Sequence, residues 1–273
     1  MKLFWDASGG SSFRLPVYHY DIYVLRGINY INIDEIMTSL SNHHLVFMPG
    51  LDGTGLSFTP LLPLLTADTQ FTIIRYPTDK LLSFEEIVEC AAAQIPAGDS
   101  FVVIAESFSG PVAVRMIASG RIEAKALVLC ATCAASPHPL LWRIVRLLHL
   151  PLLIRPDMPK LFFQIVIGDD QLIAKLGPLW KKVHADVPAN IMAHRLTILN
   201  NIDVRAELEK LQLPCLYLQA TDDRIVPSSC LKVFSRGIHR LKVKIIKAPH
   251  FILQARPQEC IRAIEEFMEQ SIH

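Results

Sequence analysis

The chain has 273 residues, of which 51% are hydrophobic and 19% charged, and its 27 basic and 26 acidic side chains nearly cancel. This apolar content excludes a disordered polymer. A collagen-like chain is also excluded, because the 12 glycines follow no period. A net charge of +1 argues against nucleic acid as the main partner, since neutralising phosphates needs a basic excess on one face. The length fits one or two domains, and equally one large domain with an insertion.

The mean hydropathy of +0.32 is high enough to require a test for membrane-spanning segments. The longest uncharged stretch, Ala126–Trp142, contains Pro137 and Pro139 and is a poor bilayer helix, which needs about 20 continuous apolar residues. Polar residues and glycines between Asp6 and Ser12 interrupt the apolar core that a secretory signal needs. We therefore expect a cytoplasmic protein without a transmembrane segment.

Most of the six cysteines lie within apolar runs, as expected of reduced residues in a protein core. They are Cys90, Cys130, Cys133, Cys215, Cys230 and Cys260. Cys130 and Cys133 form a C-x-x-C pattern, which occurs in redox pairs and in halves of zinc sites. In the sequence, no second C-x-x-C and no nearby Cys/His pair completes a metal cage. We therefore predict core cysteines, and neither a metal nor a cofactor.

Short apolar runs rich in β-branched residues recur along the chain and are predicted to be strands. They are Leu45–Met48, Phe71–Arg75, Phe101–Ala105, Ala126–Cys130, Cys215–Gln219 and Val243–Lys247. Segments with helical spacing lie between most of them, including Phe84–Ala93, Pro111–Ser119 and Pro257–Met268. Strands that alternate with helices indicate an α/β fold with a parallel sheet covered on both faces, and uninterrupted apolar strands agree with burial on both sides.

Residues 136–201 break this alternation and are predicted to be a helical insertion that rests on the sheet. Apolar residues recur there at three- and four-residue spacing. Eight basic and four acidic side chains in residues 136–200 fit a solvated helical face or attraction to anionic lipophiles and membrane surfaces. The predicted organisation is an N-terminal extension (1–43), a core (44–135 and 202–273) and a cap (136–201). In the extension, Tyr20–Leu25 and Ile28–Ile33 are typical of an edge β-hairpin.

Ser107 lies between a predicted strand and a predicted helix, in the sequence Ala-Glu-Ser-Phe-Ser-Gly. The strained backbone of such a tight turn pushes a serine outward, and the residues two before and two after it must be small. Here these residues are Ala105 and Ser109, where the G-x-S-x-G pattern has glycines. A serine in this place is also typical of a helix N-cap, so the motif indicates catalysis only together with partners.

A serine nucleophile needs a base that is oriented by a carboxylate. Asp222 and Asp223 follow the strand Cys215–Gln219, and His250 follows the strand Val243–Lys247. Because the carboxyl ends of parallel strands meet at one edge of a sheet, these side chains and the serine can converge there. The order Ser, Asp, His therefore predicts a catalytic triad.

A glycine-rich loop follows the first predicted strand, with the sequence Pro-Gly-Leu-Asp-Gly-Thr-Gly at residues 49–55. Its three glycines allow backbone amides to turn inward, and the amides of Leu51 and Phe108 are the two donors that an oxyanion hole would use. Such a loop could instead cradle phosphate, but it lacks the Lys-Ser/Thr of a P-loop and does not match G-x-G-x-x-G. We predict an oxyanion hole.

Two acidic residues adjoin the predicted site. Asp52 lies within the glycine-rich loop, and Glu106 directly precedes the serine. We interpret them as a loop carboxylate and a helix-start carboxylate, the alternative being supporting roles beside the triad.

Together these motifs make the chain resemble the α/β-hydrolase superfamily, in particular its serine esterases and lipases, from about Leu45 to Met268. The motifs are Pro-Gly-Leu-Asp-Gly-Thr-Gly, Ala-Glu-Ser-Phe-Ser-Gly, Asp-Asp-Arg-Ile-Val-Pro and Ala-Pro-His-Phe-Ile-Leu-Gln. The resemblance implies an eight-stranded, mostly parallel sheet flanked by helices, a helical cap inserted after the sixth strand, and acyl transfer through a covalent serine ester. It implies Asp223 rather than Asp222 as the acid, because Arg-Ile-Val-Pro follows Asp223 directly.

The expected function is hydrolysis of carboxylic esters, with Ser107, Asp223 and His250 as the triad and the amides of Leu51 and Phe108 as the oxyanion hole. The apolar cap indicates a small lipophilic substrate and leaves peripheral membrane contact open. Serine at the turn argues against dehalogenases and epoxide hydrolases, which resemble this scaffold but use an aspartate nucleophile. Thioesterases, acyltransferases and carbon–carbon hydrolases share the triad, and a non-catalytic protein that holds an apolar ligand is the alternative outside enzymes.

Overall fold

The computed structural model describes residues 40, 42–96, 101–136, 164 and 167–272. The hairpin predicted at Tyr20–Leu25 and Ile28–Ile33 lies outside these residues, as does most of the first half of the predicted cap. The division into extension, core and cap therefore stays a prediction. No helix in the described part of the chain is long and apolar enough to cross a membrane.

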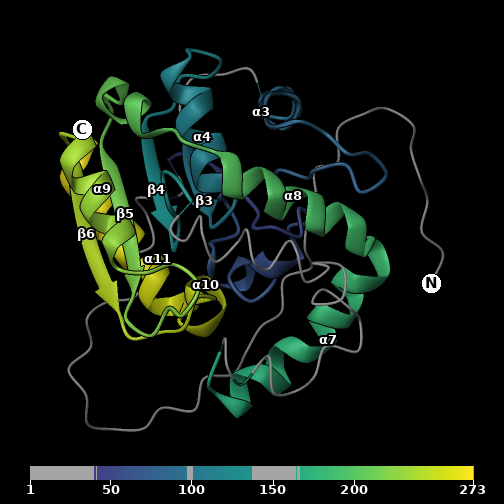
Figure 1. Ribbon diagram of the computed structural model, residues 1–273. Helices are drawn as coiled ribbons and strands as arrows, with labels where there is room; N and C mark the ends of the chain where they lie inside the picture. Colours follow the sequence, from purple (N-terminus) through teal and green to yellow (C-terminus); the bar gives the residue numbers. More distant parts are fainter. Residues whose placement is uncertain (1–39, 41, 97–100, 137–163, 165–166, 273) are drawn as a thin grey trace, which may run out of the picture. The chain divides into compact units, whose positions relative to one another are not determined.

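The described residues form a sheet of six parallel strands in the order β2-β1-β3-β4-β5-β6. The strands are β1 (His44–Met48), β2 (Phe71–Ile73), β3 (Phe101–Glu106), β4 (Ala126–Cys130), β5 (Cys215–Ala220) and β6 (Leu241–Ile246). Each matches a predicted strand, which confirms the α/β class. The described residues contain six strands, and the eight that the resemblance implied stay a prediction. In Figure 1 the arrowheads of β4 and β6 mark the edge where the carboxyl ends meet.

Burial of the strands follows their position in the sheet. The central strands β3, β4 and β5 are buried along their whole length, as their uninterrupted apolar sequences predict. The edge strand β6 differs, because its middle residues are exposed. Val243 is 41% and Ile245 63% exposed, while Lys244 alternates with them and pairs with Glu266. Lysine on an edge strand discourages pairing with other chains.

Helices cover both faces of the sheet (Figure 1). One face carries Val103 and Leu127 and packs against α3 (Phe84–Ala92), α4 (Ser109–Ala118), α9 (Ser229–Gly237) and the 3-10 helix η4 (Arg205–Lys210). The other face carries Val102 and Val128 and packs against α10 (Ile252–Ala255), α11 (Pro257–Ser271) and the short 3-10 helices η1 (Leu56–Phe58) and η2 (Leu62–Leu64). The predicted three-layer arrangement is thus confirmed.

Helix ends coincide with capping groups in the sequence. The Ser83 hydroxyl accepts from the amide of Glu86 at 3.3 Å, and the Glu86 carboxylate accepts from the amide of Ser83 at 2.7 Å, which forms a capping box before α3. The Asp169 carboxylate accepts from the amides of Gln171 and Leu172 at 2.9 and 3.0 Å and so starts α7 (Asp170–Asp186).

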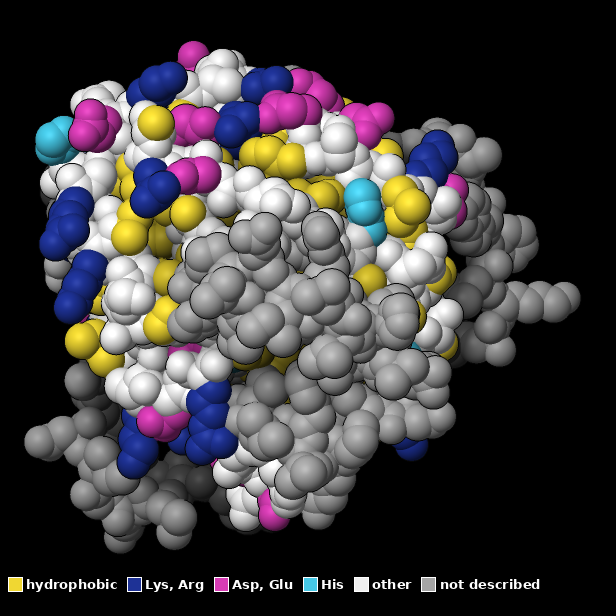
Figure 2. Space-filling view, in the orientation of Figure 1, with side chains coloured by type: hydrophobic (Ala, Val, Ile, Leu, Met, Phe, Trp, Pro, Cys, Tyr) yellow, Lys and Arg dark blue, Asp and Glu magenta, His cyan; other side chains and the backbone are white. Residues whose placement is uncertain are grey.

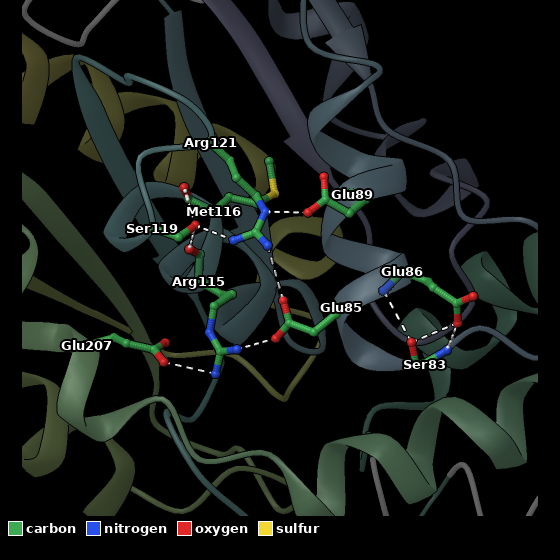
Figure 3. A network of polar contacts seen from close by, with 9 residues as sticks. All are labelled: Ser83, Glu85, Glu86, Glu89, Arg115, Met116, Ser119, Arg121 and Glu207. Carbon is green, nitrogen blue, oxygen red and sulfur yellow. Dashed lines mark hydrogen bonds and ion pairs between the residues drawn. The ribbon is translucent and has the colours of Figure 1, made fainter.

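Charged side chains of both signs are mixed along the upper edge of the face shown in Figure 2. Figure 3 shows charged side chains that link α3, α4 with the turn after it, and η4. Arg115 pairs with Glu85 and, at 2.9 Å, with Glu207, while Arg121 pairs with Glu89 at 2.6 Å. Largely exposed pairs of this kind contribute about 0.2–1 kcal/mol each, so this network adds little to the stability of the fold.

Two helices belong to the predicted cap, α7 and α8 (Ala189–Asn201). Their buried residues Val183, Ile191 and Met192 form an apolar cluster that also contacts Leu51 and Leu56. Leu51 lies in the loop after β1 and Leu56 begins η1 directly after that loop, so this part of the predicted cap packs on the predicted oxyanion loop. The cap segment therefore contacts the predicted site as well as the sheet.

Candidate active site

Ser107 lies in a strained turn between β3 and α4. Its φ is +49°, in the left-handed region that non-glycine residues rarely adopt. Two hydrogen bonds hold this turn against the end of β4 and the loop after it. The Ser107 amide donates to the carbonyl of Cys130 at 2.9 Å, and the Thr132 hydroxyl donates to the Ser107 carbonyl at 2.5 Å. Ala105 and Ser109, on either side of the turn, are completely buried. The requirement for small residues at these two positions is thus met without glycine.

His250 brings the three predicted triad residues together. Its Nε2 lies 3.0 Å from the Oγ of Ser107, and its Nδ1 lies 2.9 Å from Oδ2 of Asp223. The side chains of His250 and Asp223 are only 8% and 1% exposed. The other oxygen of Asp223 accepts from the amides of Ile225 and Val226, each at 2.8 Å, and is thereby fixed in its loop.

This arrangement has a definite chemical capacity. A carboxylate that accepts a hydrogen bond from Nδ1–H leaves the lone pair of Nε2 facing the serine hydroxyl, so the imidazole can take the serine proton during attack. The side chains come from the ends of three different strands, β3, β5 and β6. Asp222, the other carboxylate of the same loop, is exposed, and within the described residues it is Asp223 that bonds to His250.

The loop after β1 lies beside the serine. A Cβ atom at Gly50 would stand 3.8 Å from the Cβ of Ser107. Among the described residues, neither the amide of Leu51 nor that of Phe108 donates to a protein acceptor. Phe108 also immediately precedes α4, whose N-terminal dipole favours negative charge. The use of these two amides by a substrate oxygen beside Ser107 stays a prediction.

Comparison with known proteins identifies the family of the chain. Residues 45–263 match the alpha/beta hydrolase family. The chain belongs to the alpha/beta hydrolase family. No curated protein matches the chain.

Solved structures of other alpha/beta hydrolase-like proteins share the fold at low sequence identity. An esterase from Exiguobacterium antarcticum is 13% identical with a TM-score of 0.69, covering 83% of this chain and 92% of its own. An enol-lactonase from Burkholderia xenovorans LB400 is 15% identical with a TM-score of 0.66, covering 83% and 91%. A bromoperoxidase from Bacillus anthracis is 16% identical with a TM-score of 0.68, covering 83% and 92%. At such identities the likeness concerns the fold.

Glu106 occupies a different place in this hydrolase from the one predicted. It is the last residue of β3, not a helix-start carboxylate, and its side chain is 4% exposed. Its carboxylate accepts from Gln254 Nε2 at 2.8 Å and from the Ser57 hydroxyl at 3.3 Å. Burial raises the pKa of Glu106 to about 6. The prediction was wrong because the strand continues one residue further than the apolar run.

Asp52 is the loop carboxylate that the sequence indicated. It accepts from the amide of Thr54 at 2.8 Å and so closes a turn within the glycine-rich loop. Gln254 is the last residue of the histidine motif, but no sequence signal links its side chain to Glu106. The two residues are 148 positions apart, and only the fold brings them into contact.

A row of aromatic rings leads from the triad to α7. His250 and Phe251 have ring centroids 5.6 Å apart, Phe251 and Trp180 6.5 Å, and Trp180 and His184 5.0 Å. All three pairs meet edge to face, which is a favourable geometry for aromatic rings. The predicted cap thus supplies an aromatic surface next to the predicted catalytic base.

The C-x-x-C cysteines have separate surroundings. Both thiols are free and buried, and the thiol of Cys133 is hydrogen-bonded to that of Cys230, which together with burial raises the pKa of Cys133. The pKa of Cys130 is raised by burial. Within the described residues, no group of three or more His, Cys, Asp or Glu side chains could hold a metal ion.

Proposed function

We propose that this alpha/beta hydrolase is a serine hydrolase that cleaves carboxylic esters of small lipophilic molecules through an acyl-enzyme intermediate. The observation that supports it most directly is the hydrogen-bonded series Ser107 Oγ, His250 and Asp223, with distances of 3.0 and 2.9 Å. A nucleophile, a base and a group that orients the base form the minimum set for acyl transfer through serine.

In the proposed mechanism, Ser107 Oγ forms a bond to the ester carbonyl carbon while His250 Nε2 accepts the hydroxyl proton. The carbonyl oxygen becomes an oxyanion that accepts from the amides of Leu51 and Phe108. His250 then donates its proton to the leaving alkoxide, which departs as an alcohol. Water attacks the acyl-serine in the same way, with His250 as its base, and the acid leaves as Ser107 regains its proton. Asp223 stabilises the imidazolium formed in both halves.

The lipophilic character of the proposed substrate rests on the surfaces around Ser107. Trp180 and Phe251 provide aromatic faces, and Leu51 and Leu56 pack against the apolar side of α7 and α8. An apolar chain gains about 0.8 kcal/mol for each methylene that such a surface buries. Thioesters and alcohol acceptors would use the same three side chains, so they are alternatives for the substrate and not for the site.

Labelling with a fluorophosphonate tests the nucleophile, because this reagent phosphonylates a serine that an imidazole activates. We expect label on the wild type, none on Ser107→Ala, and normal labelling of Ser229→Ala, whose serine is exposed on α9. Ser107→Ala should also abolish release of nitrophenol from short nitrophenyl esters. A folded wild type that takes no label would favour the non-catalytic binding protein.

A substrate panel tests the reaction class. It contains matched esters and thioesters of two to twelve carbons, each with and without a long-chain alcohol. Release of acid from esters above thioesters supports the proposal. Faster thioester cleavage would indicate a thioesterase, and formation of a new ester from the added alcohol would indicate an acyltransferase.

A further inference from the structure

The loop that carries the Leu51 amide is held at every carbonyl from Pro49 to Gly53. The donors are the Ser109 hydroxyl to Pro49, the Gly53 amide to Gly50 at 3.1 Å, the Arg195 guanidinium to Leu51 and Asp52 at 3.0 and 2.6 Å, and the Tyr76 amide to Gly53 at 2.9 Å. Three of these donors, the Ser109 hydroxyl and the amides of Gly53 and Tyr76, come from the core or from the loop itself. Arg195 alone comes from α8, within the predicted cap.

Arg195 is a buried cation whose partners are backbone carbonyls. It is 3% exposed, and its other terminal nitrogen donates to Pro77 at 2.8 Å and to Tyr76 at 3.3 Å. Among the residues that the structure describes, no carboxylate forms an ion pair with it. The carboxylate of Asp52 binds the amide of Thr54, although the Asp52 carbonyl binds Arg195. A buried charge without an ion-pair partner costs stability, so its position calls for a functional explanation.

The loop is shaped around the guanidinium. Gly53 has a φ of +69°, and a Cβ atom there would stand 2.4 Å from Nη1 of Arg195. The Arg195 guanidinium carbon also lies 5.6 Å from the centre of the Tyr76 ring. The glycine is therefore needed both for its backbone conformation and for the approach of the arginine.

These contacts fix the direction of the Leu51 amide from both sides. The amide shares a peptide group with the Gly50 carbonyl, which accepts from Gly53, and this bond also polarises the amide as a donor. The next peptide group carries the Leu51 carbonyl, which accepts from Arg195. Loss of the guanidinium would free the peptide groups at Leu51 and Asp52 and remove the contact that shapes Gly53.

We propose that Arg195 is a positioning residue, which holds the Leu51 amide in place for the oxyanion. The oxyanion hole then depends on the position of α8 against the loop. This rests on the proposed serine hydrolase function. No motif in the sequence indicated it, because Arg195 is one of eight basic residues in residues 136–200 and is 143 positions from Asp52. Arg195 does not touch the substrate in this proposal and acts through the loop.

The test compares wild type, Arg195→Ala and Arg195→Lys with a matched control, Arg205→Ala. Arg205 is exposed and pairs with Asp203 two residues away, outside the site. Active sites are first counted by fluorophosphonate titration, so that kcat refers to correctly folded enzyme. We then measure kcat and KM for a short ester, and the affinity of an aryl trifluoromethyl ketone, which forms a tetrahedral adduct with the serine. Each assay is repeated with guanidinium chloride below its denaturing range.

We expect Arg195→Ala to lose about 10- to 100-fold in kcat per titrated site with KM changed less than about threefold, because displacement of a catalytic donor acts on the transition state. The tetrahedral adduct should weaken by the same factor. Guanidinium should restore activity to Arg195→Ala and to neither wild type nor Arg205→Ala. Arg195→Lys should fall between, since a lysine keeps the charge but not the forked donors.

A merely structural role would lower the number of titratable sites while leaving kcat per site unchanged, and this result would overturn the proposal. Absence of rescue by guanidinium, with the adduct affinity unaffected, would also overturn it. If Arg195→Ala does not fold, Arg195→Lys decides the question: its kcat per titrated site and its affinity for the tetrahedral adduct should fall by the same factor. Failure of the proposed function looks different, because the wild type itself would then take no label.

Discussion

A side chain at Gly110 would collide with Thr132. A Cβ atom built on this glycine, at the start of α4, would stand 2.1 Å from the Thr132 Oγ1 and 2.6 Å from its Cγ2. The same Oγ1 donates to the carbonyl of Ser107. The close approach of α4 to the loop after β4 therefore depends on glycine, and it fixes the turn that presents the serine.

We predict that Gly110→Ala lowers the free energy of unfolding by about 2–3 kcal/mol, as overpacking of a rigid core does, and also lowers kcat through loss of the Thr132 hydrogen bond. Urea denaturation and ester hydrolysis measure the two effects. Thr132→Ala is the partner variant, because it removes both atoms nearest to the new Cβ. The double variant should lose at least about 1 kcal/mol less free energy of unfolding than the two single variants lose together. Strictly additive costs would contradict the steric account.

A second prediction concerns Asp223→Asn. The amides of Ile225 and Val226 donate to one oxygen of Asp223, so in the variant they hold the amide oxygen and turn the NH2 group toward His250. The Nδ1 of His250 must then accept, and its proton moves to Nε2, where it blocks the proton transfer from Ser107. We expect kcat to fall by about 10⁴-fold with little change in KM.

Asp222→Asn is the matched control for this prediction. Asp222 is adjacent and exposed, so its replacement should change kcat less than about twofold. A large loss of kcat in Asp222→Asn with a small loss in Asp223→Asn would show that Asp222, and not Asp223, is the acid of the triad. Stopped assays of both variants against the same nitrophenyl ester measure the difference.

The strands were predictable because a buried parallel strand requires an uninterrupted apolar sequence, which is a local property. The runs at Ala126–Cys130 and Cys215–Gln219 match β4 and, to within one residue, β5. The convergence of Ser107, Asp223 and His250 was predictable for a related reason: each follows the end of such a run within four residues. The edge strand β6 shows the limit, because lysines alternate with apolar residues there and, among the strands that the structure describes, β5 is its one neighbour.

The contacts of Glu106 and Arg195 were not predictable from the sequence. Each is a charged residue whose burial depends on partners more than a hundred positions away, namely Gln254 for Glu106 and Asp52 for Arg195. Local sequence indicates that such residues should be exposed, as most charged residues are. Only the fold shows that their polar groups are satisfied inside the protein.

A third prediction follows from the buried carboxylate of Glu106. Burial raises its pKa from 4.5 to about 6, so the folded protein binds this proton more tightly than the unfolded chain does. The contribution to stability is therefore complete below about pH 4.5 and is lost as the pH rises to about 6, a decrease of about 2 kcal/mol in the free energy of unfolding. Glu106→Gln should not show this decrease.

Urea denaturation at pH 4 and pH 7.5 measures the effect. The free energy of unfolding of Glu106→Gln, relative to that of the wild type, should be about 2 kcal/mol higher at pH 7.5 than at pH 4. Glu123→Gln, at an exposed position, controls for removal of a surface charge and should show no such difference. A stability difference between Glu106→Gln and wild type that does not change with pH would argue against the burial of an ionising Glu106.

The last prediction concerns Trp180, which reaches from α7 to Phe251 beside the triad. If this ring lines the acyl site, Trp180→Ala should lower kcat/KM for an octanoyl ester about tenfold more than for an acetyl ester, because only the longer chain loses apolar contact, worth about 1.4 kcal/mol. Trp180→Phe, which keeps a ring, should retain most of the preference. Leu81→Ala removes an exposed apolar side chain elsewhere and should leave the ratio of the two esters unchanged. Equal losses for both esters in Trp180→Ala would place the acyl chain away from α7.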